Sequence, residues 1–261
     1  QYVIICYKNE KLLLYNYVSS SNLHRGQKYM ANIPIIFSEW KQRISSTILS
    51  SMKQRDVVFR GVHELGSDSC DRLGEFSVIG KMIRGGLVCV GDALRDGHVS
   101  DDAIKAGAAV ELFQSALLVH DDIMDRDERR RGKPSIYMQY AEMAGADGIE
   151  DDMHIGESLG ICAGDIAFFI AFEILTSLEI DDVTRNRIIA LSSRELQYVG
   201  VAQMADVYRG ALHIGPGAAT EVGVGSQTDA SLKVYLYKTG RYTFSLPLMI
   251  GALISGATDD V

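Results

Sequence analysis

The sequence predicts an all-α protein, a large helical bundle with its longest helices inside. Only four prolines occur in 261 residues, and the long intervals between them carry apolar residues at helical spacing. Strand signals are weak. Breaks rich in glycine and serine, at 131–135, 144–152 and 214–227, separate the helical segments as loops do. With 47% hydrophobic residues, the chain can bury one large core, so we expect a single folded domain.

Residues 1–29 differ in composition from the rest, because they mix aromatic residues without a sustained helical period. The chain begins with Gln, and Met30 is its first methionine. The hypothesis is that translation begins at Met30, with 1–29 as an atypical leader or upstream sequence and 30–261 as the folded domain. The opening lacks the charged start and small-residue cleavage site of a secretory signal.

Four later segments are predicted to be helical. Apolar residues recur at threes and fours from Asp101 to Asp125, which predicts one long amphipathic helix. Residues 156–178 are apolar on nearly all sides, as in a central helix that others bury. Residues 183–210 predict another long helix, and residues 229–257 predict one or two more.

Charge and cysteine content exclude several classes of function. A net charge of -8 argues against a general nucleic-acid binder, which needs a broad basic face. The four cysteines form neither a disulfide framework nor a zinc pattern, which indicates a reducing, cytoplasmic location. The longest mostly apolar stretch, 244–257, is too short and too rich in glycine for a transmembrane helix.

The stretch from Leu117 to Ser135 places carboxylates and basic residues directly after an apolar run. Asp121 and Asp125 stand one helical turn apart, with Asp122 beside them, so the pair can hold one hard cation. Magnesium takes one or two carboxylates and completes its shell with water and phosphate oxygens. The acidic string alone is equally consistent with a solvated helix end.

The neighbours of this string favour a site for a phosphorylated ligand. Gln114 lies two turns earlier on the same helix face, and Arg130, Arg131 and Gly132 follow Asp125. Arginine forks match diphosphate oxygens in a bidentate manner, and the glycine lets the chain turn back toward the metal. The arginines alone would favour a surface charge run.

These residues identify a family resemblance. The stretch "VELFQSALLVHDDIMDRDERRRGKPSIY" closely resembles the first aspartate-rich region of the trans-isoprenyl diphosphate synthases, with DDxxD, four residues and then RRGxP. "GKMIRGG" resembles their GGKRxRP signature, with Met82 and Gly85 in place of Arg and Pro. "GVAQMADV" resembles their GQxxD motif and "YKTGRYTFSLP" their KT motif, so the resemblance runs from about residue 80 to 257. It implies the isoprenoid synthase fold, a helical bundle with a central cavity.

The resemblance also implies an activity, a cofactor and partners. Members condense isopentenyl diphosphate with an allylic diphosphate (dimethylallyl, geranyl or farnesyl), use Mg²⁺ and form homodimers. Ionisation of the allylic diphosphate requires neutralisation of the leaving pyrophosphate and a dry pocket for the cation. Taken singly, the matched polar residues would be ordinary helix faces, and Tyr242 and Phe244 core aromatics. The roles carried over are metal binding for Asp121, Asp122, Asp125 and Asp206; substrate binding for Lys81, Arg84, Gln114, Arg130, Arg131 and Lys238; and catalysis for Asp121, Asp125, Arg130, Gln203, Lys238 and Thr239.

Product length is expected to depend on the residues upstream of Asp121. Phe113, Ala116 and Leu117 lie eight, five and four positions before it. Members that make farnesyl products typically carry a bulky aromatic residue at four or five positions upstream, whereas Ala116 is small here. The resemblance therefore implies a deeper pocket and a geranylgeranyl product, with Phe113 as the stop, and Ala116→Phe is expected to shorten the product.

The family's second aspartate-rich motif follows further downstream, and this chain ends before that point. Asp259 and Asp260 come too soon after the KT motif to match it. Two explanations stay open, a fragment of a longer reading frame or a naturally short, inactive relative. The alternatives to a prenyltransferase are a class I terpene cyclase, which Lys81, Arg84 and the RRG segment disfavour, and an inactive regulatory subunit, which the complete first motif disfavours.

Overall fold

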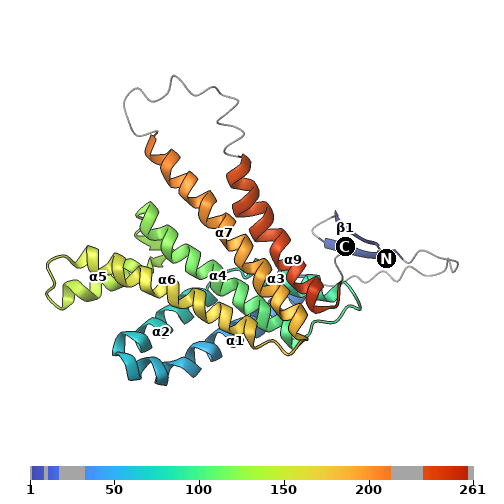
Figure 1. Ribbon diagram of the computed structural model, residues 1–261, viewed down its shortest axis with the longest axis horizontal. Helices are drawn as coiled ribbons and strands as arrows, with labels where there is room; N and C mark the ends of the chain where they lie inside the picture. The colour runs from blue at the N-terminus through green and yellow to red at the C-terminus, as the bar shows by residue number, and fades with distance from the viewer. Residues whose placement is uncertain (1, 9–10, 18–32, 213–231, 258–261) are drawn as a thin grey trace.

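The computed structural model describes residues 2–8, 11–17, 33–212 and 232–257, and it confirms the all-α prediction (Figure 1). Long helices dominate, and the connections between consecutive helices from α1 to α7 are short. The helices are α1 (Ile33–Val62), α2 (Glu64–Val78), α3 (Ile83–Ala93), α4 (Asp101–Asp125), α5 (Ile136–Ala146), α6 (Asp152–Thr176), α7 (Asp182–Leu212), the π-helix η1 (Leu236–Ser245) and α9 (Leu246–Ile254).

Helix α4 is the centre of the bundle. It contacts α1, α2, α3, α5, α6 and α9, and most of its residues before the acidic end are buried. Ser100 fixes its start, since the Ser100 hydroxyl accepts a hydrogen bond from the Ala103 amide at 3.1 Å. Its predicted bounds, Asp101 and Asp125, are confirmed. The acidic string thus lies at the carboxyl end of the most enclosed helix.

The other helical predictions are also confirmed, with one difference. The segment predicted over 183–210 is α7, and the segment predicted over 156–178 is α6, which begins four residues earlier. In the described part of 229–257, an α-helical turn at 232–235 precedes two longer elements, the π-helix η1, which carries the KT motif, and α9. Apolar periodicity does not separate a π-helix from an α-helix over so short a stretch.

Two pairs of strands were not predicted. Strands β1 (Tyr2–Lys8) and β2 (Lys11–Tyr17) pair antiparallel within the segment expected to be a leader. Strands β3 (Arg129–Arg130) and β4 (Lys133–Pro134) form a short hairpin where a loop was expected. The proposed boundary at Met30, the loop over 214–227 and the pair Asp259 and Asp260 lie outside the described residues.

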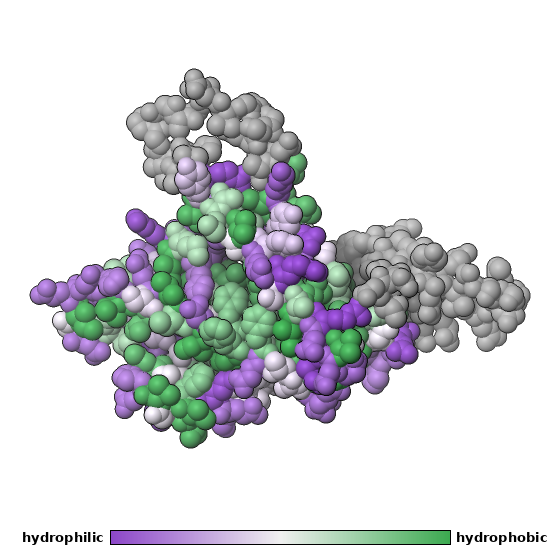
Figure 2. Space-filling model, in the orientation of Figure 1, coloured by the Kyte–Doolittle hydropathy of each residue, from purple (hydrophilic) through white to green (hydrophobic). Residues whose placement is uncertain are grey.

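Helix α6 packs against α4 and α5, and it is long and apolar enough to pass a length-and-composition test for a membrane span. Core helices of bundles pass the same test, and 44% of its apolar window is buried inside the molecule. Figure 2 shows one face of the molecule, in the orientation of Figure 1. Hydrophobic side chains gather over the middle of this face, where α4, α6 and α7 converge, and hydrophilic side chains lie toward its edges.

Candidate functional site

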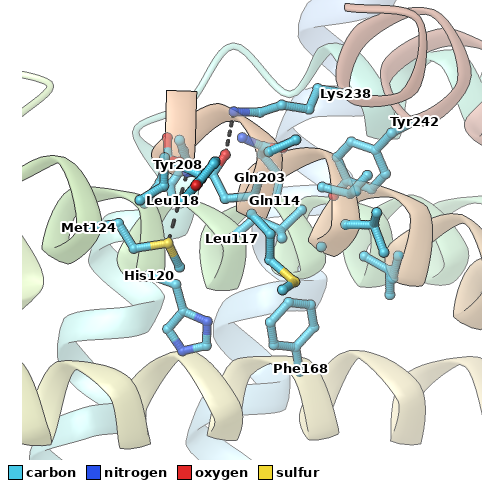
Figure 3. A pocket seen from close by; sticks show the side chains of 18 of the residues that line it. Gln114, Leu117, Leu118, His120, Met124, Phe168, Gln203, Tyr208, Lys238 and Tyr242 are labelled. Atoms are coloured by element: carbon cyan, nitrogen blue, oxygen red, sulfur yellow. Dashed lines mark hydrogen bonds between the residues drawn. The ribbon is translucent and has the colours of Figure 1, made fainter. Parts of the chain in front are cut away.

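A cavity of about 1030 Å³ lies between α4, α6, α7 and η1. Its wall is mainly apolar, and its polar residues come from motifs that are far apart in the sequence. Among the predicted residues, those that line it are Arg84, Gln114, Leu117, Asp121, Gln203 and Lys238. Figure 3 shows Lys238 and Gln203 on one side of this cavity and Phe168 on the opposite side.

A chain of hydrogen bonds connects three of the motifs at this cavity. The Gln203 Nε2 amide of α7 donates to Asp121 Oδ1 of α4 at 2.5 Å. The Lys238 ammonium of η1 donates to Gln203 Oε1 (Figure 3). It also donates to Asp206 Oδ2 at 3.1 Å. The structure therefore brings together side chains that the sequence separates by more than eighty residues.

Three carboxylates, Asp121, Asp125 and Asp206, act on one another at the acidic side of the cavity, where Lys238 and Arg209 pair with Asp206 and the charge of Arg130 lowers the pKa of Asp121. Burial raises the pKa of Asp121, Lys238 lowers it, and the nearby carboxylates Asp125 and Asp206 raise it further. Asp125 is exposed one turn beyond Asp121. Repulsion among these three groups favours a bound cation, since a cation would relieve it.

Asp122, the middle residue of the acidic string, is placed differently from its neighbours. Its side chain is fully buried, and Arg130 of β3 donates to Asp122 Oδ1 through Nε at 2.7 Å and also through Nη2. Arg130 also pairs with Asp127 at 2.9 Å. Asp122 Oδ2 is buried with no hydrogen-bond partner. Asp122 and Arg130 thus bind each other here, whereas the resemblance assigned them to a metal and to substrate.

Arg131 and Lys81 lie away from the residues that line the cavity. The Arg131 guanidinium donates to the Phe76 carbonyl in the last turn of α2 at 2.7 Å and lies over the Phe76 ring at 5.3 Å. Burial lowers the pKa of Arg131, and the charges of Arg130 and Arg84 act in the same direction. Lys81 is exposed in the short loop after α2. Of the three basic residues, Arg84 lines the cavity, and its charge acts on Arg131.

Arg84 is held by residues of η1. Its Nη2 donates to Thr243 Oγ1 at 2.7 Å, and its guanidinium lies 5.1 Å from the centroid of the Tyr242 ring. The Arg84 Nε and the Tyr242 hydroxyl are both buried without a hydrogen-bond partner, and both residues line the cavity. Thr239, the predicted second residue of the KT motif, is half-buried and does not line it.

The residues assigned to product length are also separated by the structure. Leu117 lines the cavity, whereas Phe113 and Ala116 are fully buried in the core and do not. The sequence did not single out His120, Phe168, Leu196 or Val199, which line the cavity. No periodic signal distinguishes Phe168, because α6 is apolar on nearly all sides.

The carboxylates beside the cavity fit a magnesium ion that shares its coordination shell with a diphosphate. Within the described part of the chain, no group of three or more His, Cys, Asp or Glu side chains converges on one metal position. Magnesium needs only one or two carboxylates when a diphosphate supplies further oxygens. Asp121 and Asp125 provide such a pair, and Asp206 is the third carboxylate whose charge acts on Asp121.

The fold is an all-α bundle, and its apolar cavity has acidic residues at one wall and basic residues at another. These features define a class of protein that can hold a hydrocarbon chain with an anionic head. Comparison with known families makes this specific. The polyprenyl synthetase family model matches residues 73–261, and the chain belongs to this family.

Individual relatives agree. The chain is 31% identical over 189 residues to a geranylgeranyl diphosphate synthase of Sulfolobus acidocaldarius, covering 71% of this chain and 48% of that protein. It is 30% identical over 186 residues to a (2E,6E)-farnesyl diphosphate synthase of Mycobacterium bovis, covering 70% and 42%. The chain thus spans about half the length of the curated relatives it matches.

Solved structures share the fold. The geranylgeranyl pyrophosphate synthase of Corynebacterium glutamicum, solved with isoprenyl diphosphate and magnesium, superimposes with a TM-score of 0.74 at 23% identity. The match covers 85% of this chain and 61% of that one. A geranylgeranyl pyrophosphate synthetase of Pyrococcus horikoshii gives a TM-score of 0.63 at 22% identity, covering 88% and 60%.

Proposed function

We propose that this protein is a magnesium-dependent prenyltransferase that joins isopentenyl diphosphate to an allylic diphosphate, with geranylgeranyl diphosphate as product. The observation that carries the proposal is the hydrogen-bonded connection of Asp121, Gln203, Lys238 and Asp206 beside an apolar cavity. Family membership and the geranylgeranyl synthases among its relatives support the same activity.

The charged residues of the site would bind different parts of the substrates. Lys238 lies among carboxylates and can instead pair with the diphosphate of the allylic substrate. Asp121 and Asp125, with Asp206, would hold magnesium, whose charge would stabilise the departing pyrophosphate. Arg84 and Gln114, which line the cavity, would orient the second diphosphate. Arg131 would bind the same diphosphate by exchanging the Phe76 carbonyl for a phosphate oxygen. Lys81, in the adjoining loop, would also bind it.

The cavity wall protects the intermediate. Leu117, Leu196 and Val199 present aliphatic groups to the region where the allylic cation would form, and these groups cannot trap it as water would. The Tyr242 hydroxyl and the Gln203 amide provide dipoles at its polar end.

The test is incorporation of labelled isopentenyl diphosphate with dimethylallyl, geranyl and farnesyl diphosphates in turn, with and without Mg²⁺. We expect incorporation that needs Mg²⁺ and falls by about 100-fold or more in Lys238→Ala, by analogy with the loss of other charge-stabilising groups. Lys233→Ala is the matched control, because Lys233 is an exposed lysine in the segment 232–235. No incorporation with any primer would reject the proposal, and a cyclic hydrocarbon product would favour a terpene cyclase.

We also propose a homodimer in the cytoplasm. Ile161, Cys162 and Phe169 of α6 are all exposed and fall within an arc of about 100° on the helix, which also contains the exposed Asp165. Phe169 is 72% exposed, which is unusual for so large an apolar side chain. A second copy of the chain, meeting the same face by two-fold symmetry, would cover it.

A further inference from the structure

Side chains of the π-helix η1 are hydrogen-bonded to α3 and to α7. On the α3 side, Arg84 Nη2 donates to Thr243 Oγ1 at 2.7 Å. On the α7 side, the Lys238 ammonium donates to Asp206 Oδ2 at 3.1 Å. Arg84 and Lys238 are also the residues proposed above to bind the two diphosphates, so each would give up its present partner when a substrate binds. A contact free of substrate ligands is then needed to hold η1 in place.

Arg241 of η1 and Glu195 of α7 form such a contact. Arg241 Nε donates to Glu195 Oε2 at 2.9 Å, and Arg241 Nη2 donates to Glu195 Oε1 at 2.6 Å. The two bonds give the bidentate geometry that makes an arginine–carboxylate pair strong and directional. The Glu195 side chain is only 5% exposed, so water has little access to its oxygens. Neither residue lines the cavity, and a bound diphosphate would leave the pair intact.

Two tyrosines restrict the Arg241 guanidinium further. Its central carbon lies 5.4 Å from the centroid of the Tyr198 ring of α7 and 5.6 Å from the centroid of the Tyr237 ring of η1. The centroids of the two rings are 5.4 Å apart. The guanidinium is thus bound by a carboxylate and lies over two aromatic rings, one from each helix, which opposes its rotation away from α7.

The pair is well separated from the contacts of Lys238. Glu195 lies eight residues before Gln203 on α7, or about 12 Å along the helix axis, whereas Arg241 follows Lys238 on η1. The helix η1 is therefore attached to α7 at two points. With the Arg241 end fixed, a rotation of η1 that would turn the Lys238 ammonium away from Gln203 is opposed.

We propose that Glu195 and Arg241 are a positioning pair, which keeps Lys238 at the allylic diphosphate site while the substrates bind. The inference rests on the proposed prenyltransferase function. The family resemblance assigned a role to Lys238 and none to Glu195 or Arg241. Loss of the pair would leave Lys238 present but less well aligned, and this would weaken the binding of the allylic diphosphate.

The first experiment compares the kinetics of Arg241→Met and Arg194→Met with labelled isopentenyl diphosphate. Arg194 is the matched control, because its Nε also lies 3.8 Å from Glu195 Oε1 but it belongs to α7 and cannot link α7 to η1. We expect Arg241→Met to raise the KM for the allylic diphosphate by about tenfold or more and the KM for isopentenyl diphosphate by less than about twofold. Arg194→Met should match the wild type.

A purely structural role would not separate the two substrates. Equal rises of both KM values in Arg241→Met, or the same rise in Arg194→Met, would overturn the proposal. If Arg241→Met fails to fold by circular dichroism, Arg241→Lys takes its place, because it keeps the charge and loses the bidentate geometry. The same separation of the two KM values is expected from it.

A double-mutant cycle tests whether the two residues act together. Glu195→Gln should raise the KM for the allylic diphosphate in the same direction as Arg241→Met. The variant with both changes should show no larger rise than Arg241→Met alone, since the second change removes a contact that is already lost. Rises that multiply in the double variant would reject the pair.

A binding measurement separates this proposal from the proposed function. A saturated alkyl diphosphate, which cannot form an allylic cation, is titrated by calorimetry with Mg²⁺ present. We expect Arg241→Met to bind it about tenfold or more weakly than the wild type and Arg194→Met to bind it equally. Such a difference in a protein without turnover would reject the activity and keep the pair. Equal binding by all variants would reject the pair whatever the activity, and a wild type that does not bind would reject both.

Discussion

At the scale of single residues, the three aspartates of one motif have different surroundings. Asp121 lines the cavity and Asp125 is exposed one turn beyond it, whereas Asp122 is buried against Arg130. A sequence pattern counts the three as equivalent, because spacing alone puts them on adjacent positions of one helix end. Only the fold of the β3–β4 hairpin, which places Arg130 over Asp122, separates their roles.

The first prediction concerns this separation. Asp125→Ala should raise the Mg²⁺ concentration needed for half-maximal turnover by about 10- to 100-fold with little loss of stability, because Asp125 is exposed. Asp122→Ala should instead lower the free energy of unfolding by about 1–3 kcal/mol, since it removes the buried partner of Arg130. Urea denaturation and Mg²⁺ titration of both variants test this, and equal destabilisation by the two would contradict it.

A second prediction uses the thiols. Burial raises the pKa of Cys70 to about 11 and that of Cys89 to about 12, whereas Cys162 is exposed. At pH 8 iodoacetamide should modify Cys162 in the folded protein and reach Cys70 and Cys89 only after unfolding, because the thiolate is the reactive form. Peptide mass spectrometry reads out each site. Modification of Cys89 as fast as Cys162 would show that this part of the core is open.

The same shifts set a direction for stability in alkali. Above pH 9 the unfolded chain releases thiol protons that the folded chain retains, so the unfolded state gains relative to the folded one. The contribution of these thiols to stability is therefore complete below about pH 9, and it is lost as the pH rises toward 11 and 12. Cys70→Ala with Cys89→Ala should flatten this part of the pH profile.

A third residue-scale prediction concerns Ala116. Because Ala116 is fully buried beside the cavity rather than in its wall, Ala116→Phe must displace core side chains to enter it. We expect a shorter product together with a loss of about 1–3 kcal/mol in unfolding free energy. An unchanged product from a folded variant would remove Ala116 from the residues that control length.

At the scale of elements, two helices approach each other as closely as their backbones allow. A Cβ on Gly251 of α9 would lie 2.1 Å from the Val88 carbonyl oxygen of α3, and one on Gly91 would lie 2.4 Å from the Leu248 carbonyl oxygen. The crossing sets the position of η1, which continues directly into α9, relative to α3. It therefore determines how Arg84 of α3 meets Thr243 of η1.

The prediction at this scale is that Gly251→Ala forces the helices apart. We expect a loss of about 1–3 kcal/mol in unfolding free energy and weaker binding of isopentenyl diphosphate. Gly210→Ala, on a helix where a Cβ meets nothing within 4 Å, is the control and should be neutral or stabilising by up to about 1 kcal/mol. Equal stability of the two variants would contradict the close approach.

The elements also show how far the sequence could lead. The bounds of helix α4 were predicted from its regular apolar spacing and agree with the structure, in which Ser100 caps the start of the helix. The β3–β4 hairpin was predicted as a loop, since its strands are two residues long and its turn places Arg131, at φ 54°, in a conformation that favours glycine. Within the site, motif residues could be matched to a family. Phe168 could not, because nothing in an evenly apolar helix marks the residue that faces a cavity.

At the scale of the whole molecule, one apolar helix serves two surfaces. The buried side of α6 packs on α4 and α5, and its outer face presents Ile161 and Phe169. The outer face also carries the exposed carboxylates Asp165 and Glu173. In the proposed dimer, the cavity residue Phe168 and the contact residue Phe169 are neighbours in the chain.

Phe169→Asp tests this assignment. A second carboxylate beside the exposed Asp165 should convert a dimer into monomers, as measured by light scattering after gel filtration. Val183→Asp, an exposed apolar residue in the first turn of α7, is the control and should leave the mass unchanged. A wild-type protein that is monomeric at micromolar concentration, or a Phe169→Asp variant that stays dimeric, would contradict the proposed interface.

The π-helix η1 has a consequence for how this segment tolerates changes of length. Its wider turns put residues five apart in line, so that Thr243 Oγ1 donates to the Lys238 carbonyl and Ser245 Oγ to the Gly240 carbonyl. Deleting one residue between Lys238 and Thr243 would let the segment close into an ordinary α-helix and would rotate Lys238 by about 100° relative to α9. Lys238 would still be present after such a deletion, but its ammonium group would point away from Gln203 and Asp206.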